Sequence, residues 1–451
     1  MGLFGGKIMN SFNSNRKNVA GIDMLVPLQN GSMVKEINFD NAATTPPLKS
    51  VLNELTNFSP YYSSYHRGMG YKSQLSSALY DYSKEKILDF LQGDKSLNSV
   101  IYVKNTTEAI NKLANMMRSK YDGSVVISTF MEHHSNDLPW REGFDLKYVD
   151  IDNNYRLSIA NLETLLKDNS GKVKLVTVTG ASNVTGYINP VHRIAEIVHK
   201  YGAKILVDGA QLIPHCKLNL FPNDDPKHID FITFSSHKMY APYGIGVLIG
   251  PTDELDSLEP DHKGGGTVDI VTHRKVTWDV TPHKDEAGSP NIIGAAALCA
   301  SIVTIEKMSI SDIDIYERGL KSYLIHELKN IPEAFIYIDS DIEHSVGIVP
   351  FNVDGIPHEM LSKILSYDFG IATRSGCFCA QPYVQRILNI SEEEAEVFRK
   401  QKHGRPGMVR VSFGLYNTEE EVERFISALK KIIKNKDKYL SKYSENDFSF
   451  F

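Results

Sequence analysis

Short apolar runs rich in valine and isoleucine alternate with helical patterns between about residues 99 and 250. The runs are SVIYVK (99–104), SVVIST (124–129), VKLVTVT (173–179), KILVD (204–208), DFITFS (230–235) and GVLIG (246–250). Near-continuous apolar strands of this kind are buried on both faces, as in a mostly parallel sheet. One of the helical patterns begins at Pro190 and ends at Gly202, which are typical helix boundaries. The pattern predicts an α/β fold with helices on both faces of a mostly parallel sheet.

The pattern changes after about residue 300. A long helix around 311–330 is followed by strands in AFIYI, VGIVPFNV and MVRVSFG, with a helix at 357–368 among them and a last helix opened by the capping box Thr418-x-x-Glu421. This order is typical of a smaller α+β unit. We therefore predict a flexible amino-terminal tail (1–34), a large domain (35–300) and a small carboxy-terminal domain (301–451).

Composition excludes several classes of protein. The chain has 451 residues, of which 42% are hydrophobic and 23% charged, as in ordinary globular proteins. A formal net charge of −6 disfavours nucleic-acid binding, and no apolar run has the roughly 18 residues needed to span a bilayer. Four cysteines in so long a chain do not make a disulfide framework, which indicates a reducing compartment. We expect a cytoplasmic protein with neither nucleic acid nor membrane as its partner.

The first 20 residues lack the apolar core of a signal peptide. Gly6 stands where a myristoylation signal has Ser or Thr. Lys7, Arg16 and Lys17, without acidic residues among them, leave organelle targeting open. A flexible tail is the favoured interpretation.

Polar residues collect where the predicted strands end. Ligands of an open α/β sheet bind beyond the carboxyl ends of its strands. Asn105-Thr106-Thr107 follows the first strand and opens a helix, which suits either an anion site or a plain helix cap. His133 and His134 follow the second strand; as neighbours on an extended chain they face opposite ways. One ring lying flat on a cofactor, or a satisfied core histidine, is therefore more plausible than a shared metal. Asn183 follows the third.

Asp208 and Lys238 give the sharpest signals. Asp208 ends an apolar strand, where an unpaired buried charge would be costly, so it needs a cationic partner or a ligand. Lys238, in Ser235-Ser236-His237-Lys238, ends the next strand, where desolvation makes an amine a usable nucleophile. A phosphate cradle, a flat ring, a carboxylate and an amine together fit pyridoxal 5'-phosphate. No GxGxxG motif opens a helix after a strand here, which excludes a nicotinamide module.

The motifs together resemble a known family. SSHKMYAPYGIGVL, KILVDGAQ, MEHHSNDLPW and DEAGSPN look like the class V aminotransferase branch of fold-type I pyridoxal-phosphate enzymes, and most of all like cysteine desulfurases and selenocysteine lyases. The likeness runs from INFDNAATTP (37–46) to VRVSFGLYNTEEEV (409–422), which is most of the chain. It implies the fold-type I architecture, a homodimer and a small amino-acid substrate.

The resemblance also implies roles for individual residues. Lys238 would bind the cofactor covalently and move protons, Asp208 would pair with the ring nitrogen, and His133 would stack on the ring. The other implied cofactor contacts are Gln211 and Asn183 near the ring hydroxyl, Thr106, Thr107, Ser235 and His237 at the phosphate, and Ser289 at the phosphate of the neighbouring subunit. Arg410 would clamp the substrate carboxylate, and Arg374 and His66 match further substrate positions.

In the desulfurases a loop cysteine takes the substrate sulfur as a persulfide, and Cys379 in ATRSGCFCAQP (372–382) falls at that spacing. Short-loop relatives usually carry two histidines before this cysteine, where this chain has Cys377-Phe378. Cys377 is equally compatible with a resolving thiol and with a loop filler. The segment 392–407 resembles an insertion, and GGGTVDIVTHRKVTWD resembles the hairpin of the short-loop group.

Cys216 and Cys299 lack CxxC spacing and are expected to be structural, so we predict no metal site. The sequence thus predicts a homodimeric cysteine desulfurase-like enzyme that converts L-cysteine or L-selenocysteine to alanine through a persulfide on Cys379, with a protein as possible sulfur acceptor. Two alternatives stay open. One is another class V reaction without a persulfide, such as transamination, epimerisation or C–S cleavage. The other is a non-catalytic scaffold or sulfur-relay partner.

Overall fold

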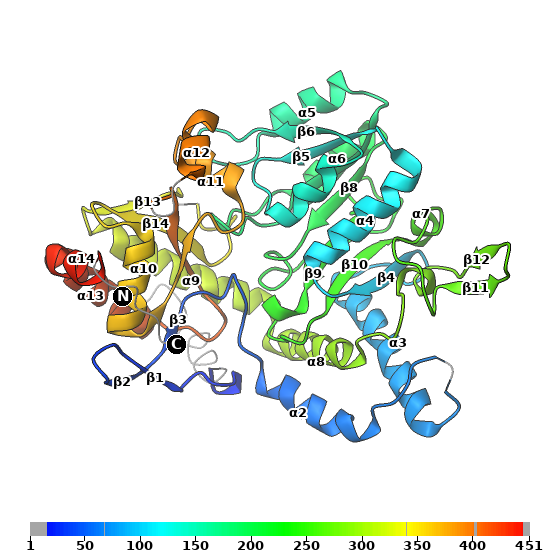
Figure 1. Cartoon of the computed structure of the whole chain (residues 1–451), viewed down its shortest axis with the longest axis horizontal. Coiled ribbons are helices and arrows are strands. Elements are labelled where there is room, and N and C mark those ends of the chain that lie inside the picture. Colours follow the sequence, from blue (N-terminus) through cyan, green and yellow to red (C-terminus); the bar gives the residue numbers. More distant parts are fainter. Residues whose placement is uncertain (1–15, 67, 340, 401–403, 445–451) are drawn as a thin grey trace.

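A computed structural model describes residues 16–66, 68–339, 341–400 and 404–444 of the chain (Figure 1). Two main sheets organise these residues. The seven-stranded sheet fills the right-hand part of the view, and the four-stranded sheet lies in the left-hand part.

The larger sheet has the strand order β4-β10-β9-β8-β7-β5-β6. Its strands are β4 (Asn98–Val103), β5 (Val125–Thr129), β6 (Asp145–Val149), β7 (Val173–Thr179), β8 (Lys204–Asp208), β9 (Phe231–Ser235) and β10 (Gly246–Pro251). β10 runs antiparallel to both of its neighbours, and all other pairs are parallel. The predicted mostly parallel sheet is therefore confirmed.

Edge strand β6 was not predicted. Its sequence, DLKYV, mixes charged and apolar residues, and only Val149 is buried. This half-exposed edge strand lacks the continuous apolar run that marked the six predicted strands, including the fully buried edge strand β4. Burial, rather than strand formation itself, was the property that the pattern detected.

Helices cover both faces of the sheet. They are α2 (Lys49–Phe58), α3 (Tyr71–Leu91), α4 (Thr106–Tyr121), α5 (Ile159–Asp168), α6 (Val191–Lys200), α7 (Thr252–Asp256) and α8 (Ile292–Met308). Successive residues of β8 face opposite ways: Leu206 lies in the apolar cluster of Leu113 on α4, and Val207 lies in the cluster of Ile194 on α6. Both faces of the strand are therefore dry, which explains its unbroken apolar sequence.

The smaller sheet has the order β13-β14-β17-β16. Its elements are β13 (Ala334–Ile336), β14 (Ile348–Val353), β16 (Arg374–Gly376) and β17 (Met408–Ser412), with helices α9 (Ile310–Lys329), α10 (His358–Phe369), α11 (Gln381–Ile387), α12 (Glu392–Arg399), α13 (Glu419–Lys434) and α14 (Lys436–Ser444). The Thr418 side chain accepts from the Glu421 N–H, and Glu421 accepts in return, so the predicted capping box is confirmed. The α+β character of this part is as expected.

The amino-terminal segment folds against the smaller sheet. Residues 1–15 of the predicted tail lie outside the described residues. Residues 16–34 contain the strand β1 (Leu25–Pro27) and all but the last residue of β2 (Met33–Lys35), and Val19 is fully buried. β3 (Ile37–Asn38) pairs in parallel with β15 (Ile371–Ala372). These strands are too short to produce a periodic signal, so the sequence pattern could not mark them. The division of the chain at residue 300 stays a prediction.

Two further segments singled out by the sequence are regular. In the insertion-like segment, α12 begins with a capping box of Ser391 and Glu394, while residues 401–403 lie outside the described part. The predicted hairpin consists of β11 (Val268–Val271) and β12 (Val276–Trp278), which extend beyond the rest of the fold at the right of Figure 1. In the described ranges, no single helix meets the length and composition expected of a membrane span; α8 and α9, which meet at 76°, meet them only as a pair.

Gly246, at the start of β10, lies against the loop that opens α4. A Cβ at this position would lie 2.5 Å from both Cα and the carbonyl carbon of Asn105. Asn105 is the N-cap of α4, and its side chain accepts from the Glu108 N–H. Glycine at 246 therefore lets the strand pass directly beneath the helix start that borders the cavity described below.

We expect Gly246→Ala to lower the free energy of unfolding by about 1–3 kcal/mol, because backbone atoms must move to admit the methyl group. The control is Gly265→Ala, where a Cβ meets nothing within 4 Å. Urea denaturation of both variants checks the prediction. Equal stability of the two would show that the close approach at 246 is not limiting.

Candidate active site

A cavity of about 340 Å³ opens at the carboxyl ends of the strands of the larger sheet. Its lining comes from both parts of the fold, because Arg374 and Arg410 belong to the smaller sheet. The predicted site residues along its wall are Thr106, Thr107, His133, Asn183, Asp208, Gln211, Ser235, His237, Lys238, Arg374, Cys379 and Arg410. Residues separated by up to 304 positions in the chain, from Thr106 to Arg410, thus meet in one place.

Asp208 and Gln211 form the floor of the cavity. Asp208 ends β8, and one carboxylate oxygen accepts from the Ala210 N–H at 3.0 Å. Burial raises the pKa of Asp208. The Gln211 amide donates to the Ala42 carbonyl at 2.7 Å, but its Oε1 is buried and lacks a partner among the described residues. A buried acceptor of this kind is completed by a donor from a ligand.

Lys238 ends the short helix η5 (Ser236–Lys238), directly after β9. Desolvation lowers the pKa of its amine to about 8, and the nearby carboxylate of Asp208 partly opposes this effect. An amine with this pKa is deprotonated near neutral pH far more often than an ordinary lysine, and is to that extent more available as a nucleophile or a base. The position and the pKa both suit covalent capture of an aldehyde.

The two adjacent histidines point to different surroundings. His133 lies on the cavity wall, and its Nδ1 accepts from the Ser135 N–H at 3.1 Å. Burial lowers the pKa of His133 to about 3, so its ring is neutral. His134 instead accepts from the Gln381 N–H through Nε2, and the two ring centroids lie 6.3 Å apart. A neutral ring at 133 can lie against a heterocycle without adding charge.

One end of the cavity is built to receive an anion. The Thr106 N–H and hydroxyl lie 2.8 and 2.7 Å from the Ser235 hydroxyl, at the first turn of α4. The Thr107 hydroxyl forms a hydrogen bond with the Ser135 hydroxyl at 2.7 Å. His237 lies alongside, and burial lowers its pKa to about 4. The hydroxyls and the positive end of the helix dipole together favour a phosphate group.

Two arginines of the cavity wall surround one carboxylate. Arg374 NH2 lies 2.8 Å from Asp40 Oδ2, and Arg410 NH2 lies 3.3 Å from Asp40 Oδ1. Arg374 and Arg410 are direct partners across β16 and β17, which fixes their spacing. Arg410 also donates to the Asn183 carbonyl at 2.8 Å, and its Nε is buried without a partner in the described part of the chain. Two guanidinium groups facing one acid leave cationic capacity for a second carboxylate.

The cysteine loop is held in an unusual backbone conformation. Phe378 and Cys379 have φ values of 52° and 56°, in the left-handed region that non-glycine residues rarely adopt. The His134 N–H donates to the Cys379 carbonyl at 2.6 Å, and the Asn183 amide donates to the Phe378 carbonyl at 2.7 Å. These contacts hold the exposed Cys379 side chain at the cavity. The site itself therefore stabilises the loop.

Cys377 and Cys299 differ from Cys379 in their surroundings. Cys377 is half-buried, its thiol lies 3.2 Å from the Pro406 carbonyl, and burial raises its pKa. Cys299 is buried inside α8, as expected for a structural residue. Neither thiol lines the cavity of Lys238.

Ser289 and His66 do not reach this cavity. They line a separate hollow together with Tyr62, Gly265 and Pro290. Within one chain they therefore contribute nothing to the site around Lys238.

Sequence reasoning missed two residues that organise the site. Asp40 pairs with both arginines. A weak signal was available, because Asp40 directly follows INF, in which two of three residues are apolar, much as Asp208 follows KILV. Ser135 links His133 to Thr107 through its backbone and its hydroxyl. No sequence pattern marks Ser135, because its role depends on the turn after β5.

The cavity fits pyridoxal 5'-phosphate in its donors and acceptors. The orphaned Oε1 of Gln211 can accept from the ring hydroxyl, and the buried carboxylate of Asp208 needs a cation such as a protonated ring nitrogen. Thr106 and Ser235 would hold the phosphate, and Lys238 would hold the aldehyde carbon.

Relatives of known type share most of the chain. The family model described as aminotransferase class-V matches residues 37–425. A probable cysteine desulfurase of Halalkalibacterium halodurans is 34% identical over 411 residues, which cover 89% of this chain and 94% of that protein.

Solved structures agree with the sequence relatives. The apo cysteine desulfurase of Thermococcus onnurineus is 31% identical with a TM-score of 0.79, and the match covers 89% of this chain and 95% of that one. The cysteine desulfurase CsdA of Escherichia coli, in its S-sulfonic acid form, is 25% identical with a TM-score of 0.78 over 96% of this chain and 99% of that one. With the family model matched over most of its length, this chain belongs to the aminotransferase class-V family.

Proposed function

We propose that this protein is a pyridoxal-phosphate-dependent cysteine desulfurase, which converts L-cysteine or L-selenocysteine to alanine and leaves the sulfur or selenium on Cys379. The names of its relatives support this reaction. The single observation that carries the proposal is that Cys379, Lys238 and Arg410 line the same cavity. A reaction without a persulfide does not need a thiol there.

Arg410 and Arg374 orient the amino acid through its carboxylate. Both guanidinium groups already share the carboxylate of Asp40, at 3.3 and 2.8 Å, so a second carboxylate can join without an uncompensated charge. Arg410 is only 3% exposed and its guanidinium lies 4.8 Å from the Phe378 ring centroid. Binding in this dry environment favours a geometrically matched, bidentate partner.

Lys238 moves protons at the reacting carbon. Its pKa of about 8 lets it both accept and return a proton near neutral pH. When bound, the cofactor withdraws electrons from the bonds of the substrate α-carbon. Lys238 is then the amine on the cavity wall that can take the α-proton and later help complete alanine.

Cys379 takes the sulfur. Its thiolate attacks the substrate sulfur, an S–S bond forms on Cys379, and the substrate C–S bond breaks with its electron pair left on carbon. The protons that complete alanine come from Lys238 and solvent, and a thiol reductant or an acceptor thiol later removes the sulfur as sulfide or as a new persulfide. The exposure of Cys379 supports transfer to a protein acceptor.

Ser289 and His66 support a homodimer. Both lie away from the cavity of their own chain, around a separate hollow, which fits a role in the site of a neighbouring subunit. The phosphate end of that neighbouring site would then be completed by Ser289.

The reactivity of the Lys238 amine should rise with pH through about 8. Only the deprotonated amine is nucleophilic, and desolvation lowers its pKa to about 8, so its reactive fraction grows as pH increases across that value. Competitive acetylation of the cofactor-free protein, followed by mass spectrometry, measures this midpoint against exposed Lys430 in the same digest. A midpoint for Lys238 no lower than that of Lys430 would contradict a desolvated amine.

Cys379→Ala should lower alanine and sulfide release from L-cysteine by at least about 100-fold in the presence of reductant, because the attacking thiol is removed. Cys377→Ala is the matched control, and we expect a change of less than about threefold, since Cys377 does not line the cavity. Bound cofactor absorbance should be retained in both. Equal rates for wild type and Cys379→Ala would favour another class V reaction, and inactivity of wild type with all amino acids tested would favour the non-catalytic alternative.

Arg410→Lys should raise KM for L-cysteine about tenfold or more, because an ammonium cannot reproduce two parallel hydrogen bonds to a carboxylate. Arg386→Lys, at a residue half-exposed and paired with Asp150, is the control and should leave KM unchanged. Steady-state kinetics with L-cysteine measures both. An unchanged KM in Arg410→Lys would exclude a carboxylate clamp at this residue.

A further inference from the structure

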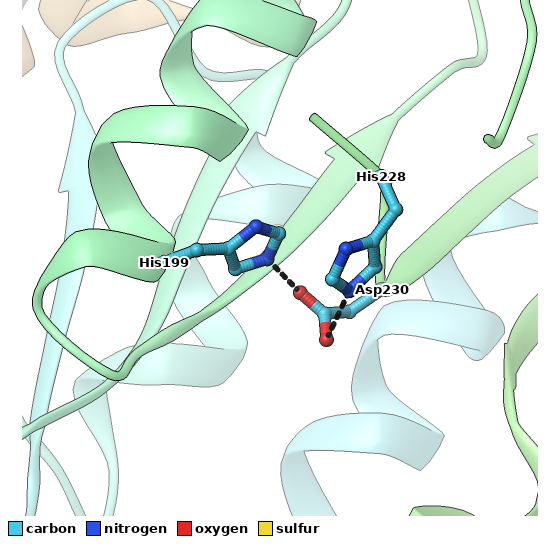
Figure 2. A group of neighbouring side chains, drawn as sticks. All are labelled: His199, His228 and Asp230. Atoms are coloured by element: carbon cyan, nitrogen blue, oxygen red, sulfur yellow. Dashed lines mark hydrogen bonds and ion pairs between the residues drawn. The ribbon is translucent and has the colours of Figure 1, made fainter. Parts of the chain in front are cut away.

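Two histidines and an aspartate meet on the side of the larger sheet opposite the cavity. His199 lies in the last turn of α6, His228 lies in the loop before β9, and Asp230 directly precedes β9 (Figure 2). Each offers a ligand atom within 4.8 Å of the others. The group lies at the amino ends of β8 and β9, whose carboxyl ends carry Asp208 and Lys238, and has no part in the proposed reaction.

The two nitrogen–oxygen distances in the group are comparable to the separation of ligand atoms in a metal site. His199 Nε2 lies 2.9 Å from Asp230 Oδ2, and His228 Nε2 lies 3.4 Å from Asp230 Oδ1. Ligand atoms around tetrahedral zinc, with bonds near 2.0–2.1 Å, lie about 3.4 Å from one another. Both contacts are drawn in Figure 2, where the two imidazole rings converge on one carboxylate.

The far nitrogens of both rings fix which atoms face Asp230. His199 Nδ1 lies 2.7 Å from the Pro226 carbonyl, and His228 Nδ1 lies 2.6 Å from the Asp225 carbonyl. A carbonyl oxygen only accepts, so each Nδ1 carries a proton and donates it. The Nε2 atom of a neutral ring then presents a lone pair to the carboxylate. Backbone carbonyls that orient ligand histidines in this way are characteristic of metal sites.

The nitrogen lone pairs and the carboxylate would repel each other. This repulsion is removed either by protonation of both rings or by a cation bound between them. Both rings could be protonated, but they stack with centroids 4.1 Å apart at 15°, and the Lys204 ammonium already lies 3.2 Å from Asp230 Oδ1. Two imidazolium rings stacked this closely would repel each other. A divalent cation between the two Nε2 atoms and Asp230 satisfies both lone pairs and leaves the rings neutral.

We propose that His199, His228 and Asp230 bind a divalent transition metal, zinc in the first place, with water as the fourth ligand. Two imidazoles and one carboxylate are the ligand types that zinc favours over magnesium or calcium. His199 and His228 keep 16% and 14% of their side-chain surface exposed, so an ion can enter. Lys204, with 34% of its side chain exposed, can release Asp230 Oδ1 toward solvent.

The site would act on stability rather than on chemistry. It connects the end of α6, the loop of residues 225–230 and the start of β9, and the Asp230 carboxylate also accepts from the Ile205 N–H of β8 at 2.9 Å. An ion here would hold two central strands and a helix together at the edge remote from the cavity. This site departs from the expectation of no metal site, which considered only the cysteines and the pair His133 and His134.

The test uses the full chain loaded with pyridoxal 5'-phosphate and freed of metal by a chelator. Titration calorimetry with Zn²⁺ compares wild type with His228→Gln and His199→Gln. Glutamine can still donate a hydrogen bond to Asp230 but is a poor zinc ligand, so the fold is preserved. His326→Gln, at an exposed histidine of α9, is the matched control.

We expect wild type and His326→Gln to bind one equivalent of Zn²⁺ that His228→Gln and His199→Gln bind at least about tenfold more weakly or lose. Zn²⁺ should raise the unfolding temperature of the first two proteins only, and Mg²⁺ should not replace it. Co²⁺ in the same site should absorb in the visible range without a thiolate charge-transfer band, which separates it from binding at Cys379. Superimposable Zn²⁺ isotherms for all four proteins would overturn the proposal and leave an ordinary ion-pair cluster.

Discussion

The removal of water around Asp208 and Lys238 is the constraint on which the site depends. One desolvated cavity raises the pKa of the acid and lowers that of the amine. Both shifts follow from burial, and each group partly offsets the shift of the other through its charge. A solvated version of the same two side chains would give an ordinary salt bridge with an unreactive ammonium. Dryness, rather than the identity of the two residues, makes the amine useful.

The larger sheet excludes water from this part of the cavity. Asp208 and Ser235 are delivered by β8 and β9, whose preceding residues are buried on both faces. The strands are rigid because their register is fixed by apolar packing, so the polar atoms at their ends cannot move apart to recover water. The arginines come from another sheet, but Arg374 and Arg410 are paired across one ladder and share Asp40, so they too have a fixed spacing.

The cysteine loop is also held in a fixed position, but by hydrogen bonds rather than by apolar packing. Cys379 is exposed and its loop has left-handed residues, so neither burial nor regular structure fixes it. Hydrogen bonds from His134 and Asn183 to its carbonyls tie it to the rest of the site. Asn183 was predicted to contact the ring hydroxyl, yet here its amide donates to the loop. A residue of the cavity wall thus also fixes the position of the loop.

The sequence predicted those features that burial imposes on the order of apolar and polar residues. Asp208 and Lys238 stood out because each interrupts an apolar run, and the central strands of the larger sheet were visible for the same reason. β6 and the strands of residues 16–34 were missed because they are short or half-covered. Ser135 was missed because its role follows from the geometry of a turn.

The cluster of His199, His228 and Asp230 was not predicted from the sequence, for a further reason. Its members come from a helix end, a loop and a strand start, at separations of 29 and 2 residues that match no ligand motif. It occupies the amino ends of the two strands that carry Asp208 and Ser235 at their carboxyl ends, a rise of about 13 Å along β8. Rigid strands of that length fix the positions of the residues at their far ends, but a charge at one end has little electrostatic effect at the other. An ion bound at their amino ends would therefore stabilise the strands that position the cavity residues. The pKa of Lys238 would still be set by the groups around Lys238 itself.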